Sequence, residues 1–174
     1  MKKIIFFDGD GTLWEPPKHK NYAEPWHIYA DEEADPFTEM QAVPIAHETL
    51  EAIGKLGIKR VLLSTSPLPP KEALVNRKQM VLSMGLDDVL DEIQFAPEYP
   101  EGKSERIIEL LASHGFKKSD ALMVGDMYKW DYKPAQDIEV DALLIERDYS
   151  YKWFENDHNA KTIKLIAEVL DYLE

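Results

Sequence analysis

Short apolar runs alternate with segments of helical spacing along most of the chain. Each run stops abruptly at polar residues, as the fully buried strands of parallel sheets do. The runs lie at residues 3–7, 60–65, 92–96, 121–124 and 141–146. The pattern therefore predicts five short strands.

The segments between the runs predict helices. Apolar residues recur at helical spacing, with a glycine at the carboxyl end, in residues 44–57, 70–85 and 103–115. The same spacing predicts a terminal helix after Asn159. Strands that alternate with helices favour an α/β fold, a doubly wound, Rossmann-like parallel sheet of about five strands in three layers. We expect residues 1–174 to form a single domain.

Residues 15–43 do not follow this alternation. They carry several prolines, an acidic run and the aromatic residues Tyr22, Trp26, Tyr29 and Phe37. Because aromatic side chains need a surface to pack on, we interpret the segment as an ordered insertion or flap and not as a linker.

Composition excludes several classes of partner. The chain has 33 Asp and Glu against 20 Lys and Arg, a formal charge of −13, so we expect neither nucleic acid nor an anionic membrane as a partner. No run approaches the roughly 20 apolar residues that span a bilayer, and the amino terminus reaches acidic residues too soon for a signal peptide, so we expect a cytoplasmic protein. The absence of cysteine rules out disulfides and thiolate zinc sites.

The first apolar run ends in two acids with a single residue between them, Asp8 and Asp10. If the strand geometry persists, both side chains point to the same side and share one site. When two carboxylates share one site, their repulsion raises the pKa of one of them unless a hard cation binds and neutralises the charge. An ionised Asp can then act as a nucleophile and a protonated neighbour as a general acid. Gly9 and Gly11 allow a sharp turn between them.

Two simpler interpretations compete with a catalytic one. The pair could be a solvated acidic turn, or "DGDGT" could begin an EF-hand loop, but Leu13 and His19 occupy the positions where that loop needs glycine and glutamate. Further polar residues follow later apolar runs. Because the carboxyl ends of parallel strands meet at one edge, Asp8, Ser64 and Asp126 are expected there together.

Four segments, spread along the chain from residue 4 to about residue 145, resemble the motifs of the haloacid dehalogenase superfamily. "IIFFDGDGTL" is similar to the first motif, "RVLLST" to the second, Lys103 fits the third, and "VGDMYKWD" fits the fourth. "DGTLW" is also similar to the first motif of the magnesium-dependent phosphatase branch. This resemblance implies Mg²⁺ as the cofactor and a phosphorylated compound, small or larger, as the partner.

The resemblance also implies roles for individual residues. Asp8 would attack phosphorus and form an aspartyl phosphate, while Asp10 would protonate the leaving alcohol and then activate water. The metal site it implies consists of Asp8, Asp10 through its backbone carbonyl, Asp126 and Asp131, the last as a ligand or as a residue that orients one. The phosphate-binding residues it implies are Thr12, Ser64, Thr65 and Lys103.

We therefore expect a magnesium-dependent phosphatase that acts on phosphate monoesters. A phosphomutase or another phosphotransferase, and a non-catalytic receiver-like module, remain as competing hypotheses. Residues 15–43 are too few for the large cap domain of many superfamily members. Without such a cap domain we expect an open site. An open site either admits a large substrate or is closed by another subunit, so a homo-oligomer is among the expected partners. We expect Trp14, Trp26 and Trp130 to anchor loops, with stacking on a sugar or base as a second possible role.

Overall fold

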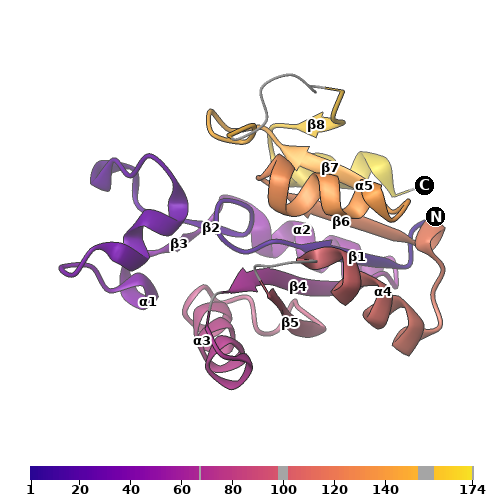
Figure 1. Ribbon diagram of the computed structural model, residues 1–174, viewed down its shortest axis with the longest axis horizontal. Helices are drawn as coiled ribbons and strands as arrows, with labels where there is room; N and C mark the ends of the chain where they lie inside the picture. Colours follow the sequence, from indigo (N-terminus) through magenta and orange to yellow (C-terminus); the bar gives the residue numbers. More distant parts are fainter. Residues whose placement is uncertain (67, 98–101, 153–158, 174) are drawn as a thin grey trace.

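The computed structural model describes residues 1–66, 68–97, 102–152 and 159–173. In these residues the chain forms a six-stranded parallel sheet of strand order β5-β4-β1-β6-β7-β8 (Figure 1). Its strands are β1 Ile4–Phe7, β4 Lys59–Ser66, β5 Glu92–Pro97, β6 Ala121–Gly125, β7 Asp141–Ile145 and β8 Thr162–Ile163. All five predicted strands are present, which confirms the doubly wound α/β fold, and β8 adds a sixth at the edge.

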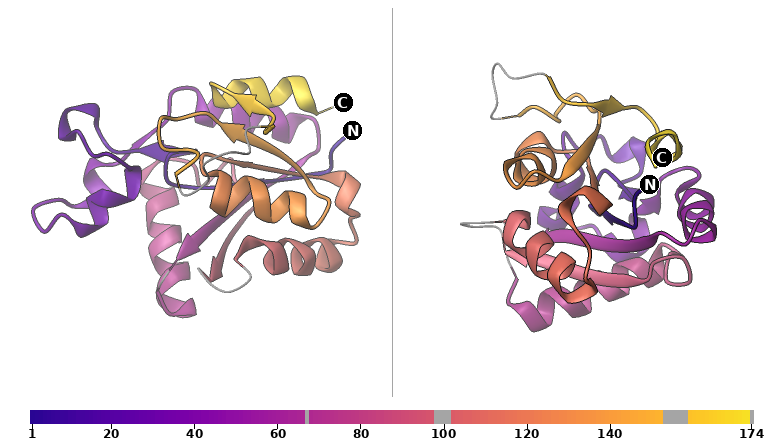
Figure 2. Two further views of the ribbon diagram at one scale, coloured as in Figure 1. Left: turned by 45° about the horizontal axis from the view of Figure 1, so that its top comes forward. Right: turned by 90° about the vertical axis from the view of Figure 1, so that its right-hand side faces the viewer.

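Helices cover both faces of the sheet, which gives the three predicted layers. Two helices and a 3₁₀ helix pack on one face: α2 Ala46–Lys55, α3 Pro70–Ser83 and η5 Ile166–Tyr172. The other face carries α4 Lys103–His114, a π-helical turn η4 Tyr128–Tyr132, and α5 Lys133–Asp137 (Figure 2). Among the described residues, no helix has the length and apolar character needed to cross a bilayer.

Strand β1 lies in the middle of the sheet and is buried on both faces. Ile5 and Phe7 belong to the core under α2 and η5, whereas Ile4 and Phe6 belong to the core under α4 and α5. This follows from the alternation of side chains along a strand. A central parallel strand has no solvent-facing side, and this explains why the run "IIFF" is apolar at every position.

The terminal segment differs from its prediction. The expected helix after Asn159 is replaced by β8 and then by η5, which begins only at Ile166. The free edge of β7 explains the difference, because the Leu144 amide donates to the Lys161 carbonyl at 2.9 Å and Ile163 pairs with Ile145. Pairing with an exposed strand edge satisfies backbone groups that a helix would otherwise have satisfied within itself.

The insertion at residues 15–43 is ordered and extends past the edge where β1 and β4 end, on the left of Figure 1. Its base is an antiparallel pair of β2 Trp14–Glu15 and β3 Gln41–Ala42. Between these strands lie η1 Lys18–Lys20, η2 Pro25–Ala30 and α1 Pro36–Glu39. Ile28 and Met40 are buried in the core shared with α2 and α3, so the insertion is packed onto the sheet domain.

Candidate active site

Six of the eight predicted site residues line one cavity at the carboxyl end of the sheet. Asp8 follows β1, Ser64 and Thr65 lie near the end of β4, and Asp126 follows β6. The cavity has a volume of about 490 Å³, and all four of these residues line it. A volume of this size is typical of sites for small molecules.

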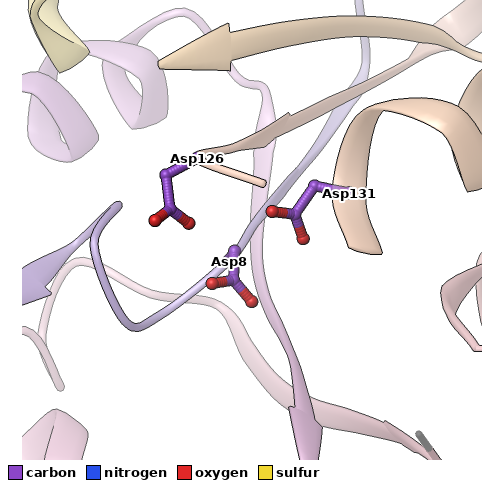
Figure 3. A group of neighbouring side chains, drawn as sticks. All are labelled: Asp8, Asp126 and Asp131. Carbon is purple, nitrogen blue, oxygen red and sulfur yellow. The ribbon is translucent and has the colours of Figure 1, made fainter. Parts of the chain in front are cut away.

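Three carboxylates point toward one another beside this cavity (Figure 3). Asp8, Asp126 and Asp131 each offer an oxygen atom, and these atoms lie within 4.8 Å of one another. All three side chains are buried. We call these three residues, together with Lys103, the acid cluster.

Lys103 is the cation of the acid cluster. It is the first residue of α4, its side chain is only 1% exposed, and its ammonium donates to Asp8 Oδ1 at 2.5 Å and to Asp131 Oδ1. Asp131 also accepts a hydrogen bond from the Met127 amide at 2.9 Å, which fixes its second oxygen. Three carboxylates against one ammonium leave a formal charge of −2 in the cluster.

This surplus of negative charge changes the acidity of the cluster. Burial raises the pKa of Asp8 to about 7; the charge of Lys103 opposes the rise and that of Asp131 adds to it. Burial also raises the pKa of Asp126 well above its usual range, and the charges of Asp131 and Asp8 add to that rise. Burial alone would lower the pKa of Lys103, but Asp131 and Asp8 outweigh it and the pKa is raised.

The donor set fits a hard divalent cation. Mg²⁺ prefers carboxylate oxygens, and a charge of +2 matches the formal charge that Lys103 leaves uncompensated. The backbone beside Asp126 is equally constrained. A Cβ atom at Gly11 would lie 2.1 Å from Asp126 Oδ2, and its φ of +78° favours glycine, so the turn can approach the carboxylate only without a side chain.

Asp10 lines the same cavity but has its own set of partners. Its Oδ1 accepts hydrogen bonds from Trp14 Nε1 at 2.9 Å and from the Tyr29 hydroxyl at 2.7 Å. Its Oδ2 accepts one from Arg77 Nη1 at 3.2 Å. We call Asp10, Trp14, Tyr29 and Arg77 the Asp10 network.

Three different elements build the Asp10 network. Trp14 is brought to Asp10 by a tight turn in which the Leu13 and Trp14 amides both donate to the Gly9 carbonyl. Tyr29 comes from η2 of the insertion. Burial and the charge of Asp10 raise its pKa, so its hydroxyl stays protonated and donates.

Arg77 comes from the middle of α3 and is itself held in place. It is 7% exposed, and its Nη2 donates to the Thr65 carbonyl at 3.1 Å. Its Nη1 also lies 3.3 Å from the Tyr29 hydroxyl. Burial opposes its charge, but Asp10 and Tyr29 outweigh that effect and its pKa is raised. Asp10 is therefore paired with a permanent cation and oriented through both oxygens.

Several solved structures resemble the chain in fold. No protein-family model matches it, and no curated protein sequence does. Among solved structures, a predicted phosphoglycolate phosphatase from Haemophilus somnus has a TM-score of 0.71 and 16% identity over 99% of this chain and 98% of that chain. The haloacid dehalogenase-like hydrolase SP0104 from Streptococcus pneumoniae has a TM-score of 0.68 and 19% identity over 99% of both chains.

A third structure, a phosphatase of the same family from Thermococcus onnurineus, has a TM-score of 0.65 and 17% identity over 99% of this chain and 98% of that chain. The chain has the haloacid dehalogenase fold. The likeness noted in the sequence is thus confirmed at the level of the fold. The haloacid dehalogenase fold also explains how motifs as distant as Asp8 and Asp131 come together, because each follows a strand that ends at the same edge.

Within the haloacid dehalogenase fold, the structure separates the predicted site residues into groups. Asp8, Asp126, Asp131 and Lys103 come together in the acid cluster. Ser64 and Thr65 line the cavity, where the Ser64 hydroxyl makes a long contact of 3.5 Å with the Thr65 carbonyl. Thr12 is buried and donates to Asp126 Oδ1 at 3.3 Å; it is not among the described residues that line this cavity.

The two acids of the first motif lie together for a different reason from the one predicted. Strand β1 ends at Phe7, so strand alternation does not extend to Asp10. The turn that follows directs the Asp10 carboxylate to Trp14, Tyr29 and Arg77, and the group of mutually close carboxylates does not include it. Both acids nevertheless line the same cavity.

Sequence reasoning missed Arg77 and Tyr29. The signal for Arg77 was present, because the buried positions of α3 are Ala73, Arg77, Met80 and Val81, at the spacing of one helical face. An arginine within such a stripe requires a buried partner. Tyr29 offered no comparable signal, because its position beside Asp10 depends on how the whole insertion folds.

Proposed function

We propose that this protein is a magnesium-dependent phosphatase that hydrolyses phosphate monoesters through a phosphorylated Asp8. The observation that carries the proposal is the division of labour around one cavity. A carboxylate that belongs to a cluster with excess negative charge and a second carboxylate held by three donors both line it. Such a site can supply both a nucleophile and a proton donor.

In the first step a carboxylate oxygen of Asp8 attacks phosphorus, and the bond between phosphorus and the ester oxygen breaks. The step requires Asp10 in its protonated form, with a proton taken up before the reaction, and Asp10 gives that proton to the departing alkoxide, which leaves as the alcohol. In the second step water attacks the phosphorus of the aspartyl phosphate, Asp10 takes a proton from that water, and the Asp8–phosphorus bond breaks to release phosphate. The three hydrogen bonds to Asp10 hold it at one position through both steps.

Asp8, Asp126 and Asp131, with the Asp10 backbone carbonyl, are the residues that would hold Mg²⁺. When bound, the ion supplies positive charge that favours the ionised form of Asp8 and attracts the phosphoryl oxygens. Lys103 neutralises part of the charge of Asp8 and Asp131. The hydroxyl groups of Ser64 and Thr65 line the cavity, where they can donate to phosphoryl oxygens.

The test is phosphate release from a panel of phosphate monoesters with Mg²⁺, for the wild type and for Asp8→Asn. We expect Asp8→Asn to lower kcat by more than about 1000-fold, because the amide cannot form the intermediate. Asp88→Asn is the matched control: this exposed acid contacts His47 near the start of α2 and should leave kcat unchanged.

Wild-type turnover by Asp8→Asn would refute the assignment of the nucleophile. Product analysis distinguishes a phosphatase from a phosphotransferase and from a receiver-like module. A phosphotransferase would convert a sugar phosphate into an isomer or another ester without releasing phosphate. A receiver-like module would accumulate a long-lived phosphoprotein that acid quenching and mass spectrometry detect.

A further inference from the structure

The lining of the cavity is of two chemical kinds. It includes the carboxylates and hydroxyl groups described above, and it also includes the side chains of Trp26, Tyr29, Leu68, Met127 and Trp130, which are largely apolar or aromatic and which we call the wall. When the phosphoryl group is at Asp8, the leaving group must lie against other parts of this lining.

Within the described lining of the cavity there is one positively charged side chain, and it is already paired with Asp10. Among the described residues that line the cavity, Arg77 is the one lysine or arginine; its Nη1 and Nη2 are bonded to Asp10, Tyr29 and the Thr65 carbonyl, and its Nε is buried. The residues outside the described ranges include neither lysine nor arginine. A second negative charge on the substrate would therefore lie among apolar and aromatic side chains with no further lysine or arginine in the described lining to balance it, at a cost in desolvation.

Two tryptophans give the wall flat surfaces. Trp26, in η2, is held edge-on by Tyr149, with ring centroids 5.7 Å apart and planes at 81°. Trp130, in η4, has the Lys129 ammonium 4.3 Å from its ring centroid. Both rings are only partly buried although each has a fixed neighbour. Indole rings exposed in this way beside a catalytic cavity can stack on flat ligands.

We propose that the substrate is a monoester whose leaving group is an uncharged alcohol bearing a flat ring, a nucleoside being the probe of that chemistry, and that Trp26 and Trp130 bind the ring. The inference rests on the proposed phosphatase function and specifies its substrate class. A cavity of about 490 Å³ is large enough for a ligand of this kind.

The first experiment compares a nucleoside 5′-monophosphate with ribose 5-phosphate. The two compounds share the reacting primary ester and differ in the base. We expect kcat/KM to be about 10-fold or more higher for the nucleotide, as the loss or gain of one stacked base typically produces. Equal values for the two compounds would overturn the role of the ring.

The second experiment isolates charge. Phosphoglycolate and 2-hydroxyethyl phosphate have nearly the same size, but the first carries a carboxylate where the second has a hydroxymethyl group. We expect kcat/KM to be at least about fivefold lower for phosphoglycolate, because the described lining holds no further lysine or arginine to balance its carboxylate. A preference for phosphoglycolate would overturn the uncharged leaving group.

Variants then locate the ring site. Trp26→Ala and Trp130→Ala should each reduce the ratio of nucleotide to ribose phosphate kcat/KM toward one, and replacement by Phe should restore part of it. Leu56→Ala is the control: this exposed residue follows α2 at the opposite edge of the sheet, and its loss should leave the ratio intact. If the tryptophans only support loops, both substrates will lose activity in parallel and the ratio will not move, which contradicts the proposal.

The outcomes also separate this inference from the phosphatase proposal. If ribose 5-phosphate is hydrolysed in an Asp8-dependent manner without preference for a ring, the inference fails and the phosphatase stands. If neither these compounds nor p-nitrophenyl phosphate is hydrolysed with Mg²⁺, the phosphatase proposal fails and the substrate class fails with it.

Discussion

Asp8 and Asp10 are two residues apart in the chain, yet their surroundings differ in charge. Asp8 shares one ammonium with Asp131 and lies close to Asp126, so its cluster has a formal charge of −2. Asp10 is paired with one guanidinium and accepts two further hydrogen bonds from neutral donors, so its network has no net charge. The charge of the first arrangement calls for a further cation, whereas that of the second is already balanced.

This difference predicts how each group responds to perturbation. Burying three carboxylates in the acid cluster costs free energy. That cost is offset by the ammonium of Lys103 and by any metal ion that binds. The Asp10 network is held by several weaker contacts, and the loss of one leaves the others in place. The cluster should therefore respond strongly to charge and to metal, and the network should respond mainly to the loss of hydrogen bonds.

The largest expected effect is that of Lys103→Met. Removal of the ammonium leaves three buried carboxylates without compensation, and the loss of one partner of a buried ion pair typically costs about 3–5 kcal/mol. Urea unfolding in the absence of divalent ions should show this loss in the free energy of unfolding. Arg77→Met should cost less, because Asp10 keeps its bonds to Trp14 and Tyr29.

Lys55→Met serves as the control for that pair of variants. Its ammonium makes an exposed contact with Glu51 one helical turn away, so its loss should change stability by less than about 0.5 kcal/mol. Equal losses for Lys103→Met and Arg77→Met would contradict the distinction between the cluster and the network.

The next effect in size is stabilisation by Mg²⁺. A cation that binds only the folded chain should add about 2.7 kcal/mol at 100 times its dissociation constant, measured as a rise in Tm. Asp126→Asn should remove this response, because it takes away a charge from the cluster. Arg77→Met should keep it, since the Asp10 network is not part of the proposed metal site.

The same response should depend on pH, and its sign follows from the raised pKa of Asp8. In the metal-free protein Asp8 has a pKa of about 7, above the ordinary 3.8 of the unfolded chain. Between these values the folded state binds the additional proton, so metal-free stability rises as the pH falls from about 7 toward 4. Mg²⁺ must displace that proton, so its effect on Tm should be greatest above pH 7 and weaken below it. A response that grows on acidification would contradict this assignment.

The acid cluster could be predicted from the sequence because topology places it. Asp8 and Asp126 directly follow apolar runs, and the ends of parallel strands meet at one edge whatever the details of packing. Lys103 was identified only by its resemblance to a family motif, and its burial against two carboxylates is a result of how α4 docks. Local patterns thus sufficed where a strand end fixed the position of a side chain.

The Asp10 network could not be predicted in this way. Tyr29 belongs to an insertion without a repeating pattern, and Arg77 lies inside a helix more than sixty residues from its partner Asp10 in the chain. The edge strand β8 was missed for a related reason, because helical spacing in residues 159–174 does not reveal the unpaired edge of β7. In each case the outcome depends on a surface that only the folded chain provides.

The smallest predicted effect tests the network most directly. Tyr29→Phe removes one hydrogen bond to Asp10 Oδ1 and keeps the ring at the cavity wall. We expect stability to fall by about 1 kcal/mol and kcat to fall roughly 3- to 10-fold with KM little changed, because Asp10 would be less firmly positioned for proton transfer. Steady-state kinetics on one phosphate monoester, with saturating Mg²⁺, gives both constants.

The insertion contains a matched control for this variant. Tyr22 also donates its hydroxyl to a carboxylate, that of Asp31, at 2.5 Å, but this pair is separate from the network around Asp10. Tyr22→Phe therefore removes the same chemical group from the same segment and should leave kcat unchanged. If both variants lose kcat equally, the effect comes from loosening the insertion as a whole. If Tyr29→Phe alone does so while its Tm still rises with Mg²⁺ as in the wild type, the hydroxyl acts through Asp10 and the two acids are independent in the way their charges indicate.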